Sequence, residues 1–506
     1  MNKIIFQKFN FLFISFTLLV TFLKWLMLVS NSDLISVVSA LLSIGLLGSV
    51  IFLGASKQLP DNSHFRFKSM LAFILTILGL WGLLLPLGLF GLSSYFITAF
   101  PLSGNQFTWL TINRYWIVGS LGILYIALLT IALVMRRFFY YWFQNLDQRL
   151  LQVLKRAWRA SSLKDLLISY TLIFTQIALI AGLVGGLMLI NALINQRLFF
   201  ILSLGIINLL IPLIELDLLF KLLTFPVEES IKRLKFSLRP ALGVGSLLLI
   251  TLMSNSWYPG STALSQQTII VHRGVINGNS IPNTIGSLKK NSRYHFPYIE
   301  MDVQETKDHH FICAHDDTIK TLHHRRQEID HLKLATIKKL HRTELFGKYL
   351  KLANRFKQPL IVELKVTNDS DKEMGTRFAN QFGKQLLKQP SMVHSVGYNF
   401  LRQIKTRFPK IRIGLVTMLN FSRIANYRVD FYTLQHTTLT PFLLRSIQPK
   451  RPVYAWTDDH IWSMKQLSLM GVGGQVTDRA FALKKLQFLP QRNNWLLLLN
   501  LLTTYL

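Results

Sequence analysis

The stretches Ile269-Ile-Val-His-Arg-Gly274 and Ile299-Glu-Met-Asp-Val303 decide how the C-terminal half of this chain folds. Each is a short β-like run that carries ionisable residues at or near its end, where a fully buried strand would carry Val or Ile. A third polar piece, Ala314-His-Asp316, follows the second run. These pieces indicate strands whose ends carry chemistry rather than packing alone.

Similar runs recur through residues 267–492, with amphipathic helical patterns between them. The predicted strands are 268–272, 297–303, 359–365, 392–395, 411–417, 429–435, 452–456 and 474–477. Helical patterns intervene at 372–387, 398–407, 440–447 and 458–470. Strands that alternate with helices over this length predict a parallel TIM-type (β/α)8 barrel, with an insertion around 317–358. Chemistry in such barrels lies at the carboxyl ends of the strands.

Carboxylates cluster at those predicted ends. Glu300 and Asp302 end the second run, on one strand face and ~6–7 Å apart, and Glu363 ends the third. Three carboxylates at one barrel mouth repel unless a cation lies among them, and such hard oxygen ligands suit Ca²⁺ or Mg²⁺. The alternative is that each carboxylate pairs with a basic residue such as Arg273 or Lys365.

Two histidines complete this set of residues. His272 precedes Arg273, and His315 lies beyond the second strand, so they form a candidate acid/base pair of suitable intrinsic pKa. A lone histidine in a strand can equally be a hydrogen-bonded core residue. Cys313 is the single cysteine, which excludes an intrachain disulfide and is most simply a buried structural thiol.

Residues 1–257 have a different character and predict a polytopic membrane domain of about seven helices. The chain is 50% hydrophobic, with a mean hydropathy of +0.33. The candidate spans are 11–30, 34–55, 69–90, 115–135, 165–193, 198–220 and 240–256. Residues 258–266 form a linker. The apolar C-terminal segment 493–506 is too short to span, so we expect a helix docked on the barrel or lying in the membrane interface.

Loop charges predict the orientation. With the N-terminus in the cytoplasm, the inside segments carry 17 Lys and Arg residues and the outside loops carry only Arg114 and Arg197. Seven crossings then place the barrel outside the cell, as part of a multi-pass cell-membrane protein. Glu215 and Asp217 lie within a span, where either structural pairing with Lys221 or an ion or headgroup role is open.

The formal net charge of +31 favours anionic lipid headgroups or polyanionic substrates. Nucleic acid is not the expected partner, because no recognition helix, aromatic stacking strip or zinc framework accompanies the charge.

Several motifs together carry a resemblance to a known family. In chain order they are His272-Arg-Gly274, Asn283-Thr284, Ile299-Glu-x-Asp-Val-x-x-Thr-Lys-Asp308, His315-Asp316, Val362-Glu-x-Lys365, Trp456-Thr457, Gly471-Val472 and Thr477-Asp478. This set resembles the glycerophosphodiester phosphodiesterase family across 268–480. The membrane half resembles the multi-helix domain that precedes this barrel in membrane-bound bacterial members.

The resemblance implies a hydrolase that releases glycerol 3-phosphate and an alcohol from glycerophosphodiesters. It implies His272 and His315 as general acid and base, and a substrate-binding role for Arg273, Lys365 and Trp456. It also implies one divalent cation, Ca²⁺ or Mg²⁺, held by a set of three carboxylates. Those ligands are Glu300, Asp302 and Glu363. In this family the neighbouring glycerol hydroxyl attacks first, and water then opens the cyclic phosphate.

The natural substrate stays open at this point. A glycerophosphodiester, an anionic lipid or lysolipid, or a polyglycerol-phosphate polymer of a cell wall would each suit a basic barrel tethered to a membrane. Two other functions compete: a lipid or ion transporter with a non-catalytic barrel, and a phospholipase C- or D-like enzyme acting on intact lipids. Departures from the family pattern fall at Pro282, His309, Asp459 and Gly473, none of them an implied ligand or catalytic histidine.

Overall fold

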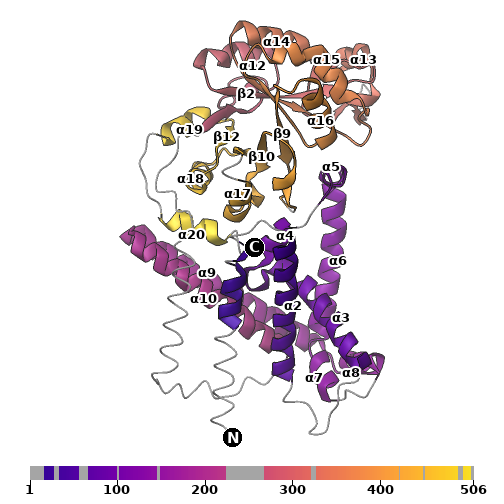
Figure 1. Ribbon diagram of the computed structural model, residues 1–506, viewed down its shortest axis with the longest axis vertical. Helices are drawn as coiled ribbons and strands as arrows, with labels where there is room; N and C mark the ends of the chain where they lie inside the picture. The colour runs from indigo at the N-terminus through magenta and orange to yellow at the C-terminus, as the bar shows by residue number, and fades with distance from the viewer. Residues whose placement is uncertain are drawn as a thin grey trace. The chain divides into compact units, whose positions relative to one another are not determined.

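A computed structural model of the chain describes most of its residues and divides them into two units. The described residues are 16–24, 26–27, 33–55, 67–99, 102–144, 149–223, 267–320, 326–420, 422–447, 451–487 and 494–502. One unit contains 1–99, 118–259 and 493–506, and the other contains 100–117 and 260–492. Figure 1 draws the helical unit and the barrel unit with their element labels.

The helical unit consists of long apolar helices joined by short ones. Its elements include α2 (Asp33–Ala55), α3 (Phe67–Leu84), α4 (Ser93–Ala99), most of α6 (Arg114–Val134), α7 (Phe138–Gln144), α8 (Leu150–Arg159), α9 (Leu163–Ile194), α10 (Arg197–Leu222) and α20 (Asn494–Leu502). Five helices are long and apolar enough to cross a membrane: α2, α3, α6, α9 and α10. They fall on the second to sixth predicted spans. The first span is described only in part, and 240–256 lies outside the described residues.

Two acidic side chains of this unit, Asp165 and Asp217, have basic partners. Asp165 accepts from Arg136 at 2.7 Å and Arg137 at 3.0 Å. Asp217 lies 2.6 Å from Lys221, the pairing that the sequence offered as one alternative. The C-terminal helix α20 packs along α9 and α10, which places it in the helical unit.

The barrel unit contains a closed ring of eight parallel strands, which confirms the predicted TIM-type fold. The strands are β1 (Thr268–Val271), β2 (Tyr298–Glu305), β7 (Leu360–Leu364), β8 (Met392–Ser395), β9 (Arg412–Thr417), β10 (Phe431–Gln435), β11 (Val453–Trp456) and β12 (Gly474–Thr477). Each strand pairs with the next in sequence order, and β1 pairs with both β2 and β12 to close the ring. Each predicted run therefore corresponds to one strand of the ring.

Helices cover the outside of this ring (Figure 1). They are α12 (Ile285–Asn291), α14 (Phe346–Arg355), α15 (Met374–Leu386), α16 (Tyr398–Arg407), α17 (Pro441–Ile447), α18 (Ile461–Met470) and α19 (Ala480–Leu486). The main apolar core lies between the strands and these helices and contains fully buried Met301, Val362 and Phe378. A smaller cluster inside the ring, including Ile361, Met392 and Phe431, fills the barrel beneath the strand ends.

The insertion after β2 begins earlier than predicted. β3 (Phe311–Cys313) runs antiparallel to β2 and pairs with β6 (Glu344–Leu345). Between them lie the hairpin β4 (Thr318–Lys320) and β5 (Arg326–Glu328), and α13 (Leu334–Leu340). The following helix, α14, covers the barrel wall instead of belonging to the insertion. Cys313 is buried, as expected of a structural thiol.

A short helix from the N-terminal half belongs to the barrel unit. It is α5 (Gly104–Ile112), which directly precedes α6, and a capping box of Ser103 and Gln106 starts it. Phe107 is 3% exposed, and its ring centroid lies 5.6 Å from that of Tyr427. Thr108 Oγ1 donates to Val396 O at 3.0 Å. In the sequence, α5 falls between the predicted spans 69–90 and 115–135, and no local pattern indicates that it packs on the barrel.

Candidate active site

One pocket is lined by all eight side chains that the sequence singled out. They are His272, Arg273, Glu300, Asp302, His315, Glu363, Lys365 and Trp456. His272, Arg273 and Lys365 follow barrel strands, Trp456 ends β11, and Glu363 is the last residue but one of β7. Glu300 and Asp302 lie within β2, and His315 follows β3. Six further residues line the same pocket: His394, Val416, Met418, Thr433, Thr457 and Val476.

A tight turn after β1 presents His272 and Arg273. Arg273 has φ +49° and Gly274 has φ +70°, two successive left-handed residues that turn the chain sharply at the strand end. Such backbone is unfavourable for arginine and is typical of functional sites. The turn lets Arg273 N donate to Glu300 Oε2 at 3.0 Å. A Cβ on Gly274 would lie 3.0 Å from Ser287 Oγ, so only glycine fits closely there.

His272 is held by an acidic partner from the neighbouring strand end. β12 pairs with β1, with Thr477 opposite Val271. Asp478, the next residue, therefore lies beside His272, and its Oδ1 is 2.9 Å from His272 Nδ1. Burial would lower the pKa of His272, but the contact with Asp478 and the nearby Glu300 charge raise it above its ordinary value.

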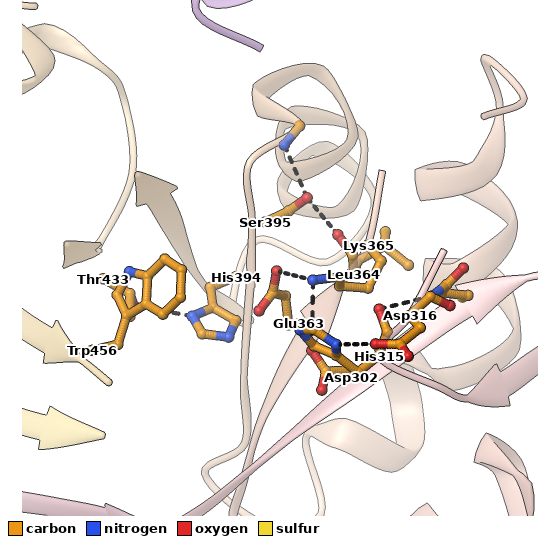
Figure 2. Close-up of polar contacts among 12 residues, drawn as sticks. Asp302, His315, Asp316, Glu363, Leu364, Lys365, His394, Ser395, Thr433 and Trp456 are labelled. Atoms are coloured by element: carbon orange, nitrogen blue, oxygen red, sulfur yellow. Dashed lines mark hydrogen bonds and ion pairs between the residues drawn. The ribbon is translucent and has the colours of Figure 1, made fainter. Parts of the chain in front are cut away.

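His315 has a similar but more exposed arrangement. Its Nδ1 lies 2.8 Å from Asp316 Oδ1, and the two side chains are 38% and 84% exposed. Figure 2 shows this pair close to Asp302. In each implied catalytic histidine, Nδ1 is therefore within hydrogen-bond distance of a carboxylate oxygen. This contact fixes the tautomer of the ring and leaves Nε2 available for proton transfer.

Asp302 is 1% exposed and is surrounded by donors. Asn283 Nδ2 donates to its Oδ2 at 2.8 Å, and Arg273 Nε lies 3.3 Å from the same oxygen. Lys365 Nζ lies 3.9 Å from Oδ1. Burial and the charge of Glu300 raise the pKa of Asp302 to about 6. The sequence alternative, pairing with Arg273 and Lys365, is thus present at this carboxylate.

Lys365 links two strands of the wall. Asp302 and Glu363 are register partners on β2 and β7. Lys365 Nζ lies 3.3 Å from Glu363 Oε1, and Figure 2 draws the lysine between the two carboxylates. Burial alone would lower the pKa of Lys365, but Glu363 and Asp302 raise it, so the ammonium stays charged. Two cationic side chains, Arg273 and Lys365, thus face three carboxylates, which leaves one excess negative charge that a bound cation would offset.

The donor set fits such a cation. Glu300, Glu363 and His394 each offer one atom, and these atoms all lie within 4.8 Å of one another. Burial would raise the pKa of Glu300, but the His394 and His272 imidazoles lower it to about 2, so it is ionised as a ligand must be. This group contains two of the three predicted ligands. The role of Asp302 as a ligand stays a prediction.

Sequence reasoning missed three residues that contact this site. Asp478 and Asn283 stood inside quoted motifs without a role, because nothing local shows which side chain they touch. His394 lay in a predicted strand, and the strand-end rule that selected Glu363 would also have selected it. Its alternation with buried Met392 points both side chains into the ring.

Comparisons with known proteins agree with this geometry. Residues 272–481 match the model of the Glycerophosphoryl diester phosphodiesterase family. A glycerophosphodiester phosphodiesterase of Caldanaerobacter subterraneus is 25% identical over 230 residues, which are 42% of this chain and 93% of the relative. The Bacillus subtilis protein YhdW, provisionally given the same enzyme name, is 24% identical over 229 residues, 42% of this chain and 93% of its own.

A solved structure also aligns with the barrel. It is an Oleispira antarctica phosphodiesterase in complex with sn-glycerol-3-phosphate, with 16% sequence identity and a TM-score of 0.37. The alignment covers 43% of this chain and 95% of that one.

Proposed function

We propose, from the premise that residues 272–481 form a glycerophosphodiester phosphodiesterase domain, that this pocket hydrolyses glycerophosphodiesters to glycerol 3-phosphate and an alcohol. The observation that carries the proposal is the convergence of eight side chains, chosen from sequence alone, on one pocket.

The roles follow from charge and reach. Arg273 and Lys365 would hold the phosphate oxygens, and Glu300, Glu363 and their neighbours would hold a divalent cation. That cation, when bound, would neutralise charge that develops on the phosphate. His272 and His315 would move protons on and off the attacking and leaving oxygens, because each has Nδ1 on a carboxylate. Trp456 lines the pocket, and its Nε1 donates a hydrogen bond to Thr417 O at 3.2 Å. Its ring would contact the substrate.

The domain is proposed to act at the outer face of a cell membrane. The loop charges favour this side for the segment between α4 and α6. Helix α5 lies in that segment and packs on the barrel through Phe107 and Thr108. A barrel bound to an outside loop supports the same side for both. This support does not depend on the seventh predicted span.

Attachment to a membrane and the net charge of +31 both favour an anionic substrate that occurs near the membrane surface, such as a lipid-derived diester or a polyglycerol-phosphate polymer. We compare glycerol 3-phosphate release by purified full-length protein from deacylated phospholipid, lysolipid and polyglycerol-phosphate polymer. We expect turnover on at least one of them, abolished in His315→Ala. Negligible release from all three would contradict the proposed function, and turnover of intact phospholipid alone would favour a phospholipase.

A further inference from the structure

We propose that His394 Nε2 is a nitrogen ligand of the cation site and that it biases the site toward Mn²⁺, Co²⁺ or Zn²⁺ over Ca²⁺. The proposal rests on the proposed function only in using the same pocket. It concerns which ion the pocket selects, and binding alone can test it.

The first observation is a buried nitrogen atom without a partner. His394 is 2% exposed. Its Nδ1 lies 3.0 Å from Thr433 Oγ1, whereas Nε2 has no hydrogen-bond partner within the described part of the chain. Leaving such a buried polar atom unsatisfied is unfavourable. When Nδ1–H donates to Thr433, the Nε2 lone pair is free to bind a cation.

The second observation is where Nε2 points. Glu363 and His394 are register partners on β7 and β8, and Nε2 lies 3.9 Å from Glu300 Oε1. A charge-assisted hydrogen bond would be about 2.7–2.9 Å long, so this separation is not an optimal ion pair. Donor atoms about 2.0–2.2 Å from one shared ion lie roughly 3–4 Å apart, which matches the observed spacing.

The third observation is that the ring is held in place. Phe431 lies beside it, with ring centroids 6.3 Å apart at 30°. Gly414, the β9 register partner of His394, has no side chain, and any Cβ there would collide with the Phe431 ring. Phe431 and Thr433 thus fix the imidazole from the β10 side. A ligand fixed before binding loses little entropy when the ion arrives.

Ligand chemistry then sets the preference. Ca²⁺ and Mg²⁺ favour all-oxygen sites, whereas imidazole suits zinc and the later first-row transition metals. Mn²⁺ also binds carboxylates well, but as the first member of that transition-metal series it accepts a nitrogen ligand more readily than Ca²⁺ does. Two carboxylates and one imidazole on neighbouring strands form a mixed oxygen–nitrogen set. We therefore expect a different ion from the Ca²⁺ or Mg²⁺ that the carboxylates alone suggested.

The test measures binding rather than turnover. Full-length protein is titrated calorimetrically with MnCl₂ and with CaCl₂, and the Mn²⁺ form is examined by electron spin-echo spectroscopy for ¹⁴N coupling. We expect ¹⁴N coupling and tighter Mn²⁺ than Ca²⁺ binding. His394→Gln should lose the coupling and about 10–100-fold in Mn²⁺ affinity, with a much smaller change for Ca²⁺. His341→Gln, an exposed histidine of the insertion, is the matched control and should change neither.

The outcomes separate cleanly. No ¹⁴N coupling in the wild type, or equal losses for both ions in His394→Gln, would overturn the proposal. If that variant does not fold, the coupling is compared in three other variants: His272→Gln, His315→Gln and His331→Gln. His331 belongs, with Glu328 and Asp369, to a second group that could hold an ion. Survival of the coupling in all three supports His394 as the ligand, and its loss in any of them overturns the proposal. If ¹⁴N coupling to Mn²⁺ is observed but the protein does not hydrolyse glycerophosphodiesters, the proposed function is contradicted and this inference is not.

Discussion

Asp478→Asn tests how the pocket tunes its histidines. The carboxylate lies 2.9 Å from His272 Nδ1 and raises the pKa of that imidazole. The amide keeps a hydrogen-bond acceptor, so ring orientation is retained while the negative charge is removed. The change should therefore lower the pKa of His272 without unfolding the turn.

The magnitude follows from exposure. A hydrogen bond to a charged group contributes about 1.5–3 kcal/mol when it is buried. The Asp478 side chain is 41% exposed, and solvent screening reduces the effect to about 1 kcal/mol. Losing this stabilisation of the imidazolium should lower the pKa of His272.

The assay is kcat/KM for glycerophosphodiester hydrolysis as a function of pH, at saturating metal. The limb governed by His272 should move to lower pH. Movement of the basic limb identifies His272 as the general acid, and movement of the acidic limb identifies it as the base. Asp316→Asn is the matched control, because Asp316 contacts His315 instead of His272, and it should leave the His272 limb in place. A profile of Asp478→Asn that superimposes on the wild type would refute the reasoning.

Two further predictions concern stability and topology. Arg377→Met removes the guanidinium that donates to buried Glu305 at 2.7 and 2.9 Å. The free energy of unfolding of the barrel should therefore fall by about 2–3 kcal/mol and its melting temperature by roughly 5–10 °C, whereas Arg355→Met, at an exposed position, should change neither. Equal melting temperatures for the two variants would contradict this prediction. Lys351→Cys on the barrel should react with an impermeant maleimide in intact cells, and Lys155→Cys in α8 only after permeabilisation; the reverse pattern would refute the outside location.

The barrel was predictable because its signal is local. Each strand is a short apolar run, and helical patterns stand between several of these runs. The strand-end rule then selects the polar residues that meet. Glu300 and Glu363 could be chosen in this way without knowing any contact. The bounds of the insertion were predicted less accurately, because no periodicity in the sequence indicates that β3 pairs with β2 as an antiparallel strand.

The parts that sequence missed depend on tertiary contacts. Helix α5 has a local signal, the Ser103-x-x-Gln106 capping box, but its docking on the barrel is visible only when Phe107 meets Tyr427. His394 shows the same limit in the pocket. From the sequence, a single histidine in an apolar strand is most simply a buried core residue. Only the structure shows that its Nε2 has no hydrogen-bond partner and lies near two carboxylates.

The most direct test of the central claim is kcat/KM for glycerol 3-phosphate release by Glu363→Gln. Glu363 lines the pocket, contacts Lys365 and belongs to the candidate cation group. Its amide keeps the shape and removes the charge, so we expect a fall of about 100-fold or more, with exposed Glu373→Gln at the wild-type value. Wild-type activity in Glu363→Gln would contradict the assignment of this pocket as the site of hydrolysis.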